Sequence, residues 1–494
     1  MSDTTAWKLA CLLGTFGPIA MYFGAPFWCS VLLSSLFLLA GRLSERYAGK
    51  LGCVVLALYP IYIFLVELQQ WWNGDLGVDF GIFSQVIDQT SKRNLFQTSL
   101  ISTEWQNFFT HHFSPYLFIL GTISQLGIPA ELTLLLAHSC SAGALAAGVF
   151  SIFRFATLSN SRAAIFTSLI LLAPGVRNGM IWETHDEVLA LPWIVWSIYA
   201  FMRGNLSQAT ALLIPCLLFK ETAGFTIAPL ALWYAVSTKP PKKFKAAALA
   251  VVALLFSCLL LFVFPGWLYT PTFTPTSRLG SLTELLSWPV LRDKVLWLLM
   301  ISLPALPFLA LCSKRSFCKS APFLGAALFS ISSIAVTTYG AMYSYTNYYS
   351  VVPSVLIMLA ITVPVCVHRL SGAAICLGLL LALFTGQSIR LSRHFVNIIS
   401  APSAASELVP LIPFGAPVAV DDYTASVLST HAQPVRIEHA RRSSTKFDYL
   451  VYSQKHSGPA QTSKFTDQFK LCHETRRYLV YCSKLQAKGD ISQP

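Results

Sequence analysis

Long apolar runs separated by short polar segments fill the first 390 residues of the chain. Because a bilayer core takes about 20 apolar residues per helix, such runs predict membrane-spanning helices. Thirteen runs are candidates: 9–23, 27–41, 52–68, 130–153, 163–181, 186–202, 208–219, 222–237, 246–265, 294–312, 321–339, 351–367 and 372–389.

Two of these assignments have alternatives. The first two runs, which residues 24–26 separate, could form one long tilted helix. Lys220 and Glu221 interrupt the otherwise continuous run 208–237. A helical hairpin is favoured there, because a through-helix would leave two charges at mid-membrane.

Residues 69–129 form the longest segment between runs. Interfacial helices that lie on a bilayer are rich in aromatic residues, and this segment contains Trp71, Trp72, Trp105, Phe108 and Phe109. The apolar stretch 115–127 within it is too short to span a membrane, so we expect it to pack at the interface.

The composition changes after residue 390, where charged residues become common and short β-like runs occur at 418–420, 435–439, 449–453 and 478–483. This pattern predicts a small α/β domain with a frayed end at 488–494. The sequence thus predicts an N-terminal helix pair (1–50), a transmembrane core (51–390) with the large loop 69–129, and a C-terminal domain (391–494).

The chain is 54% apolar and only 12% charged, whereas soluble domains are about 25% charged. This excludes a soluble enzyme, a disordered chain, a coiled coil and a disulfide-framework protein. The net charge of +13 could suggest nucleic acid as a partner, but most of the chain lacks the polar surface that a basic groove needs. The expected partner is the lipid bilayer.

Lysine and arginine are unevenly distributed among the loops. If the N-terminus is cytoplasmic, the loops on that side hold 15 basic and two acidic residues, and those on the other side hold seven basic and twelve acidic ones. Cytoplasmic loops are enriched in Lys and Arg. We therefore predict an α-helical polytopic protein of the bacterial inner (plasma) membrane, with about 11–13 transmembrane helices and an extracytoplasmic C-terminal domain.

Cys472 and Cys482 flank a predicted hairpin turn at 474–476 in the C-terminal domain. An oxidising periplasm would favour a disulfide between them. Two reduced thiols are the alternative, because a spacing of ten residues does not prove suitable geometry.

Ionisable residues near a membrane are costly and therefore indicate function. They gather at four places, all on the predicted outer side: Asp75 and Asp79; His111 and His112; Glu183, His185, Asp186 and Glu187; and Lys220 with Glu221.

Each cluster also has a purely structural interpretation. Asp75 and Asp79 could cap the helix that follows. Paired histidines at an interface are more often surface residues than ligands. The loop 182–187 could be an exposed polar loop, and Lys220 could simply pair with Glu221.

Convergence on one side favours function over these alternatives. Carboxylates with His and Lys at a membrane surface can deprotonate a hydroxyl and hold a phosphate. No Gly-rich nucleotide fingerprint occurs, and no His/Cys set has zinc spacing. Asp79, His185 and Asp186 could nevertheless bind a divalent cation such as Mg²⁺ or Mn²⁺.

The sequence resembles a family of bacterial and archaeal membrane proteins, domain-of-unknown-function family 2079 (DUF2079), over residues 50–460. The stretches that carry the resemblance, which are weak singly but fairly specific in their order and spacing, are 79–85 (Asp-Phe-Gly-Ile-Phe-Ser-Gln), 112–115 (His-Phe-Ser-Pro), 185–192, 220–224 (Lys-Glu-Thr-Ala-Gly), 417–421 and 447–453. The first helix pair and the Cys472–Cys482 hairpin look like additions to the family pattern.

That family looks distantly like the GT-C glycosyltransferases, which take a sugar from a polyprenyl-phosphate donor on the outer face and use an acidic residue of the first large outer loop. The resemblance implies that Asp79 is the general base or a metal ligand. By charge, Lys220 is assigned to the donor phosphate. His112 and His185 would assist, and Glu187 with Glu221 would bind acceptor or sugar.

The sequence therefore predicts an integral-membrane glycosyltransferase that moves a sugar from a polyprenyl-phosphate donor to an acceptor hydroxyl. A transporter or lipid-carrier flippase is one alternative, although alternating access would call for ionisable residues on both sides of the membrane. A non-catalytic membrane scaffold is the other alternative, and it would leave the four clusters dispersed.

Overall fold

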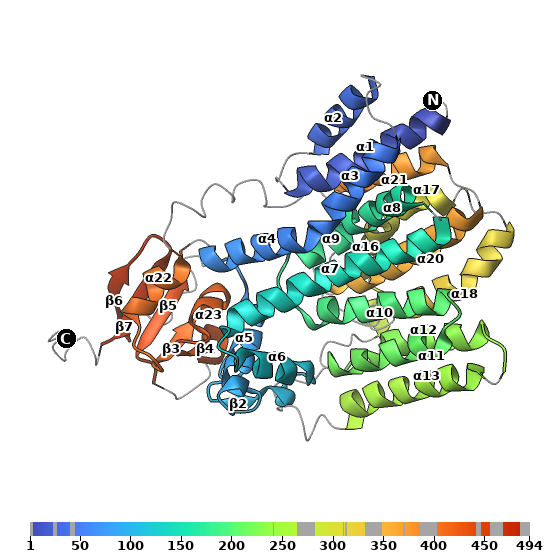
Figure 1. Cartoon of the computed structure of the whole chain (residues 1–494). Coiled ribbons are helices and arrows are strands. Elements are labelled where there is room, and N and C mark those ends of the chain that lie inside the picture. Colours follow the sequence, from blue (N-terminus) through green and yellow to red (C-terminus); the bar gives the residue numbers. More distant parts are fainter. Residues whose placement is uncertain are drawn as a thin grey trace. The chain divides into compact units, whose positions relative to one another are not determined.

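The computed structural model (Figure 1) describes residues 3–22, 27–39, 45–157, 159–240, 242–263, 282–309, 311, 314–330, 348–368, 371–385, 403–440, 446–454 and 468–484. The predicted end 488–494 and parts of the runs 9–23, 27–41, 246–265, 294–312, 321–339 and 372–389 lie outside these residues. The chain divides into two compact units. We call Met1–Ile63, His138–Trp182 and Asp186–Arg393 the helical unit, and Phe64–Ala137, Glu183–His185 and His394–Pro494 the mixed unit.

The helical unit follows the apolar runs of the sequence closely. Its elements are α1 (Asp3–Tyr22), α2 (Phe27–Leu39), α3 (Glu45–Ala57), the start of α4 (Tyr59–Asn73), most of α7 (Ala130–Thr157), α8 (Asn160–Leu172), α9 (Pro174–Met180), α10 (Asp186–Met202), α11 (Leu206–Leu213), η2 (Ile214–Leu218), α12 (Gly224–Val236), α13 (Lys242–Cys258), the π-helix η3 (Leu259–Val263), α15 (Leu282–Leu285), α16 (Trp288–Ser302), η5 (Leu303–Ala305), α17 (Leu306–Leu309), α18 (Lys314–Ser330), η7 (Tyr348–Ser350), α20 (Val351–His368) and α21 (Gly372–Thr385).

Three stretches of the described chain are helical, long and apolar enough to cross a membrane: Lys50–Asn73, Ala130–Thr157 and Lys242–Val263. The bent pair α8 and α9 would make a fourth. Pro174 explains the bend, because proline lacks the N–H that would continue the helix, and the two helices meet at 70°. Shorter apolar helices occupy several other predicted runs, among them Leu206–Leu218 and Val351–Pro364.

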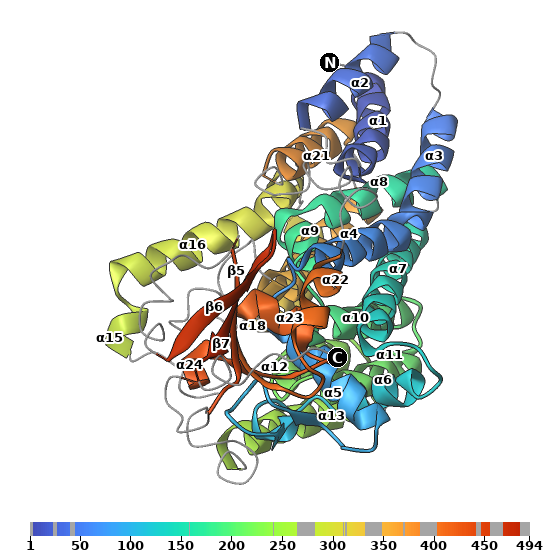
Figure 2. The same ribbon diagram turned by 90° about the vertical axis from the view of Figure 1, so that its left-hand side faces the viewer.

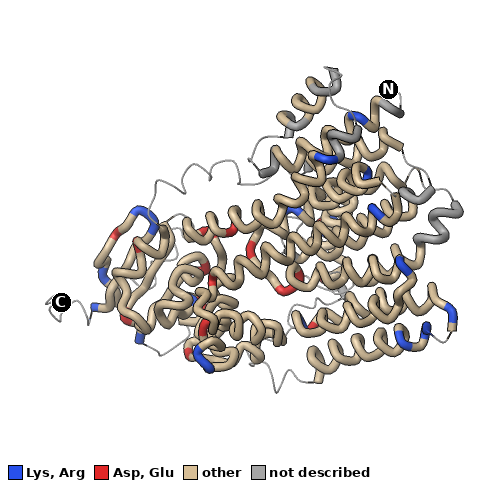
Figure 3. The backbone as a smooth tube through the Cα atoms, in the orientation of Figure 1, with Lys and Arg blue, Asp and Glu red and all other residues tan. Residues whose placement is uncertain are grey.

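Charged residues separate to opposite ends of the hairpins that α10 to α13 form (Figure 3). Arg203 follows the end of α10, and lysines surround the turn between α12 and α13. Asp186 and Glu187 begin α10, and Glu221 precedes α12. The helices therefore have one basic end and one acidic end, the asymmetry that positive-inside membrane proteins display.

The first part of the mixed unit is the segment that joins α4 to α7. It contains α5 (Val78–Ser91), the short strands β1 (Gln97–Thr98) and β2 (Gln106–Asn107), the 3₁₀ turn η1 (Phe108–Thr110) and α6 (Tyr116–Ser124). Helix α6 buries Leu117 and Gly121 against α5 and exposes Phe118 and Ile119. As expected from the sequence, this helix is too short to span a bilayer.

The second part of the mixed unit is a small α/β fold (Figure 2). Its elements are α22 (Ala404–Leu408), η10 (Val409–Leu411), β3 (Pro417–Val420), α23 (Asp422–Leu428), β4 (Gln433–Arg436), α24 (Ile437–Ala440), β5 (Tyr449–Ser453), β6 (Phe469–Glu474) and β7 (Tyr478–Ser483). The strand order is β4-β3-β5-β7-β6, with β3 parallel to β4 and β5, and with β7 antiparallel to β5 and β6.

Two details of this sheet differ from the sequence prediction. The run 435–439 was expected to be a strand, but the strand ends at Arg436 and the chain turns into α24. Strand β6 was not predicted, because its alternating apolar positions, Phe469 and Leu471, are few and lie among charged residues. The β6–β7 hairpin brings Cys472 and Cys482 together in a disulfide.

The two parts of the mixed unit pack through α5 and α23. A Cβ atom on Gly81 would lie 3.1 Å from the backbone of Ala425 and Ser426, so the two helices approach closely only because residue 81 is glycine. The hydroxyl of Ser426 donates to the carbonyl of Leu76 at 2.9 Å. A second hydrogen bond joins the two parts, because the hydroxyl of Ser99 donates to the carbonyl of Pro434 at 2.7 Å.

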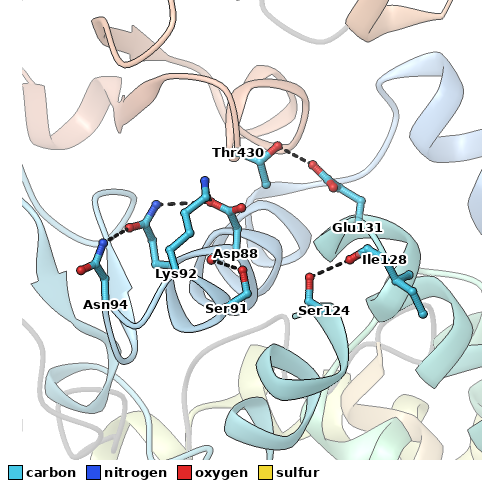
Figure 4. Close-up of polar contacts among 9 residues, drawn as sticks. Asp88, Ser91, Lys92, Asn94, Ser124, Ile128, Glu131 and Thr430 are labelled. Carbon is cyan, nitrogen blue, oxygen red and sulfur yellow. Dashed lines mark hydrogen bonds and ion pairs between the residues drawn. The ribbon is translucent and has the colours of Figure 1, made fainter. Parts of the chain in front are cut away.

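Polar contacts at the far end of α5 complete this packing (Figure 4). Lys92 pairs with Asp88 at 2.7 Å one turn earlier, and the Thr430 hydroxyl donates to a carboxylate oxygen of Glu131 at 2.6 Å. The start of α7 and the C-terminal fold are thereby joined.

Candidate functional site

The first turn of α5 is capped by a carboxylate from a distant part of the chain. The N-cap position is Gly77, which has no side chain to cap the helix. Glu183 takes this role, because its Oε2 accepts hydrogen bonds from the backbone N–H groups of Gly77 at 3.0 Å and Phe80 at 3.4 Å. Helix N-termini leave their first N–H groups unpaired and favour negative charge. Glu183 thus accepts hydrogen bonds from the first turn of α5, and Asp79 lies within that turn.

Asp79, Glu183 and His185 form one cluster. The Oδ2 of Asp79 lies 3.8 Å from the Nδ1 of His185, and the Nε2 of His185 lies 3.5 Å from the Oε1 of Glu183. The side chain of Asp79 is 40% exposed, whereas those of His185 and Glu183 are 4% and 7% exposed. One accessible carboxylate is thus supported by two buried groups that lie more than 100 positions away in the sequence.

The same three side chains could hold a metal ion. One ligand atom from each lies within 4.8 Å of the others, and bonds of about 2.0–2.2 Å from nitrogen and oxygen would require only small side-chain movements to close this distance. Two carboxylates with one imidazole suit Mn²⁺ or Zn²⁺ better than Mg²⁺, which prefers oxygen. The third ligand in this group is Glu183, where the sequence suggested Asp186.

A third acidic residue, Glu67, lies next to this cluster in the same unit. Glu67 on α4 is fully buried, and its Oε1 accepts a hydrogen bond from the hydroxyl of Thr184 at 3.4 Å. Sequence reasoning overlooked Glu67 and the role of Glu183. The available signal was the presence of a carboxylate inside the apolar run 52–68, because such groups are rarely placed there without a role.

His112 belongs to the same unit but not to the carboxylate cluster. Its ring lies 6.1 Å from that of Phe108, Phe108 lies 5.9 Å from Phe83, and Phe83 lies 6.3 Å from His185, all between ring centroids. His111 stacks edge-on against His112 at 4.5 Å. The second predicted cluster is therefore joined to the first through two buried aromatic rings.

The order of residue types in 79–85 has a physical explanation in this chain. Asp79 is the accessible acid, and Gly81 allows the close approach of α23. Gln85 is buried, and its Oε1 accepts hydrogen bonds from the hydroxyl of Thr98 at 2.7 Å and the N–H of Ser99 at 2.9 Å. This segment thus combines an exposed acid with the contacts that position it.

Lys220 and Glu187 form a second cluster, which belongs to the helical unit. The Nζ of Lys220 lies 2.5 Å from the Oε1 of Glu187, and the two side chains are 13% and 19% exposed. The ring of Tyr349 lies 5.2 Å from the same ammonium group. The ion pair of Lys220 thus forms with Glu187, and the adjacent Glu221 also acts electrostatically on the ammonium group.

The electrostatic balance at Lys220 favours its charged form. Burial alone would lower the pKa of Lys220, but the Glu187 carboxylate and the nearby Asp186 and Glu221 outweigh this effect and raise the pKa above its ordinary value. Glu221 is itself buried, at 2% exposure. The stretch 220–224 ends at Gly224, where a Cβ atom would collide with the carbonyl of Ala253 on α13.

Residues 76–491 match the model of a family described as "Predicted membrane protein (DUF2079)". The chain belongs to this family. The match begins just before α5 and extends through the Cys472–Cys482 hairpin, so this hairpin is part of the family pattern rather than an addition to it. No curated protein matches the chain.

Proposed function

We propose that this DUF2079 member is a GT-C-like glycosyltransferase of the bacterial inner membrane, which transfers a sugar from a polyprenyl-phosphate donor to an acceptor hydroxyl on the extracytoplasmic face. In this proposal about 11–13 helices cross the membrane and the N-terminus is cytoplasmic. The core 51–390 carries the large loop, and the domain 391–494 lies outside. The segregation of basic and acidic residues along α10 to α13 supports this orientation.

The observation that carries the proposal is the accessible carboxylate of Asp79 beside buried Glu183 and His185. A general base must reach the proton that it removes, and Asp79 is the exposed member of this cluster. Asp79 would take the proton of the acceptor hydroxyl while the hydroxyl oxygen bonds to the anomeric carbon of the sugar. The bond from that carbon to the phosphate oxygen then breaks, and polyprenyl phosphate leaves.

The remaining predicted residues take supporting roles in this proposal. His185 and Glu183 hold Asp79 in place, and His112 contributes to substrate binding on the same side. Lys220 would contact the donor phosphate, with Glu187 and Glu221 binding acceptor or sugar hydroxyls. In a metal-dependent variant of this proposal, Asp79, Glu183 and His185 would instead hold a divalent cation, which would neutralise charge on the leaving phosphate.

A deletion strain tests the proposal. Loss of a transferase should cause a polyprenyl-phosphate sugar to accumulate in lipid extracts, and wild-type protein should remove it. Asp79→Asn should fail to do so, because a general base contributes about 10²–10⁴-fold to the rate. Asp88→Asn is the matched control, since Asp88 lies on the same helix and pairs with Lys92. An unchanged lipid profile in the deletion strain would contradict the proposed reaction.

A further inference from the structure

Arg177 is a buried cation without a counter-ion in the described part of the chain. It lies on α9, whose residues are all buried, and it is 9% exposed itself. Its Nε has no hydrogen-bond partner among the described residues, and its guanidinium forms no ion pair there. Arginine stays protonated in proteins, so a full positive charge is held inside the helical unit.

The surroundings of Arg177 are polar but neutral. The nearest groups that influence it electrostatically are the phenols of Tyr59 and Tyr62 on α4, which are themselves 1% and 4% exposed. A phenol can donate or accept a hydrogen bond, but it does not neutralise a cation. Arg177 also lies in the last turn of α9, where the helix dipole favours a cation. That partial charge is far smaller than the charge that burial leaves uncompensated.

Lys220 provides the internal comparison. Its side chain is 13% exposed, and its charge is balanced by Glu187 at 2.5 Å. Burying an ion is unfavourable unless it is paired and hydrogen-bonded. Arg177 is more deeply buried than Lys220 but has no such partner among the described residues, so its charge is available to an anion.

Arg177 lies at the same end of the helical unit as the Lys220–Glu187 pair, because both are close to η7. Helix α9 contacts η7, and α10, which begins next to Glu187, also contacts η7. Tyr349 of η7 lies 5.2 Å from the ammonium group of Lys220. Residue 177 also comes shortly before the loop 182–185, which the proposed topology places on the outer side.

We propose that Arg177 binds the phosphate group of a membrane lipid. A guanidinium presents two parallel N–H donors that match two phosphate oxygens, and the two phenols could donate to the remaining ones. A lipid is favoured over a free phosphate because α9 is entirely buried and, with α8, forms an apolar stretch that could cross a membrane. This inference rests on the proposed function only in naming that lipid as the polyprenyl-phosphate donor, whose phosphate Arg177 would contact in addition to Lys220.

Binding of a short prenyl phosphate to the full-length protein in detergent tests this inference. Farnesyl phosphate is the probe, and farnesol and inorganic phosphate are compared with it. We expect farnesyl phosphate to bind wild-type protein and to bind Arg177→Met at least tenfold more weakly. Arg154→Met, which removes an exposed arginine of α7, should bind as wild type does. Equal affinity of wild type and Arg177→Met would overturn the inference, and equally tight binding of inorganic phosphate would overturn its lipid part.

Thermal unfolding without ligand separates this role from a structural one. Removing an uncompensated buried charge should leave the melting temperature of Arg177→Met unchanged or higher, whereas an internally paired arginine would give a lower one and overturn the inference. Arg177→Lys keeps the positive charge but lacks the two parallel N–H donors of the guanidinium. This variant should fold and should bind farnesyl phosphate several-fold more weakly than wild type. If Arg177→Met does not fold and Arg177→Lys binds as wild type does, the inference fails.

The outcome is independent of the test of Asp79. Asp79→Asn should retain farnesyl phosphate binding, because Asp79 belongs to the mixed unit and acts on the acceptor. If Asp79→Asn keeps full transfer activity, the proposed chemistry fails while the phosphate site stands. If Arg177→Met keeps full affinity, the phosphate site fails while the proposed chemistry stands.

Discussion

Replacing Glu183 should open the first turn of α5, because this carboxylate supplies the cap that Gly77 lacks. Hydrogen bonds to charged acceptors contribute about 1.5–3 kcal/mol each. The bond from the N–H of Phe80 to Glu183 is long, at 3.4 Å, so its contribution lies at the lower end of this range. Removing the charge also relieves repulsion with Asp79, which offsets part of the loss. Glu183→Ala should therefore destabilise this turn by about 2 kcal/mol.

Glu183→Gln is the informative partner of that variant. It keeps an oxygen in the same place, and a neutral acceptor forms hydrogen bonds roughly half as strong as a charged one. The turn should then lose only about 1 kcal/mol, while the negative charge beside His185 disappears. Glu183→Gln should accordingly weaken binding of Mn²⁺ nearly as much as Glu183→Ala does, because a carboxamide is a poor ligand for the ion.

Amide hydrogen exchange of the segment 76–83 measures this effect directly, because local opening free energies appear as protection factors. A change of about 2 kcal/mol corresponds to a roughly 30-fold loss of protection at Gly77 and Phe80 in Glu183→Ala, and about 1 kcal/mol to roughly fivefold in Glu183→Gln. Glu104→Ala, which removes an exposed acid of the same unit, should change nothing. Protection within twofold of wild type in Glu183→Ala would refute the capping role.

Three further predictions concern packing and pairing. Gly81→Leu should release the C-terminal fold from α5, because a larger side chain would meet the backbone of α23; faster limited proteolysis after residue 403 would reveal it. Lys220→Met should destabilise the helical unit by about 1.5–3 kcal/mol, because it removes the ammonium group that pairs with the partly buried Glu187, and the double variant with Glu187→Met should recover most of this in a thermal melt. Replacing Cys472 and Cys482 with alanine should lower the free energy of unfolding by about 2–3 kcal/mol. Thiol labelling of the unfolded wild-type chain checks that the disulfide is present.

Much of the helical architecture follows from hydrophobicity alone. The run 186–202 coincides with α10, and 351–367 nearly coincides with α20, because each is a continuous apolar run without an early break. The run 163–181 did not predict the 70° bend between α8 and α9. Apolar content predicts burial, whereas the bend depends on one missing N–H at Pro174.

The site was predictable only in part, for a similar reason. Asp79 and His185 stand out as ionisable residues in an apolar chain, and the structure brings them to 3.8 Å. The cap supplied by Glu183 joins residues more than 100 positions apart, and nothing local marks it. The ion pair of Lys220 with Glu187 was likewise not predicted, because the two residues lie 33 positions apart and only the adjacent Glu221 stood as an alternative partner.

The central claim is that Asp79 performs the transfer chemistry. It is tested by incubating purified protein in proteoliposomes with lipid extract from the deletion strain, and following lipid-linked sugar by mass spectrometry. Wild type and Asp88→Asn should consume the accumulated species at similar rates, and Asp79→Asn should be at least about 100-fold slower. Consumption by Asp79→Asn at the wild-type rate would contradict the account.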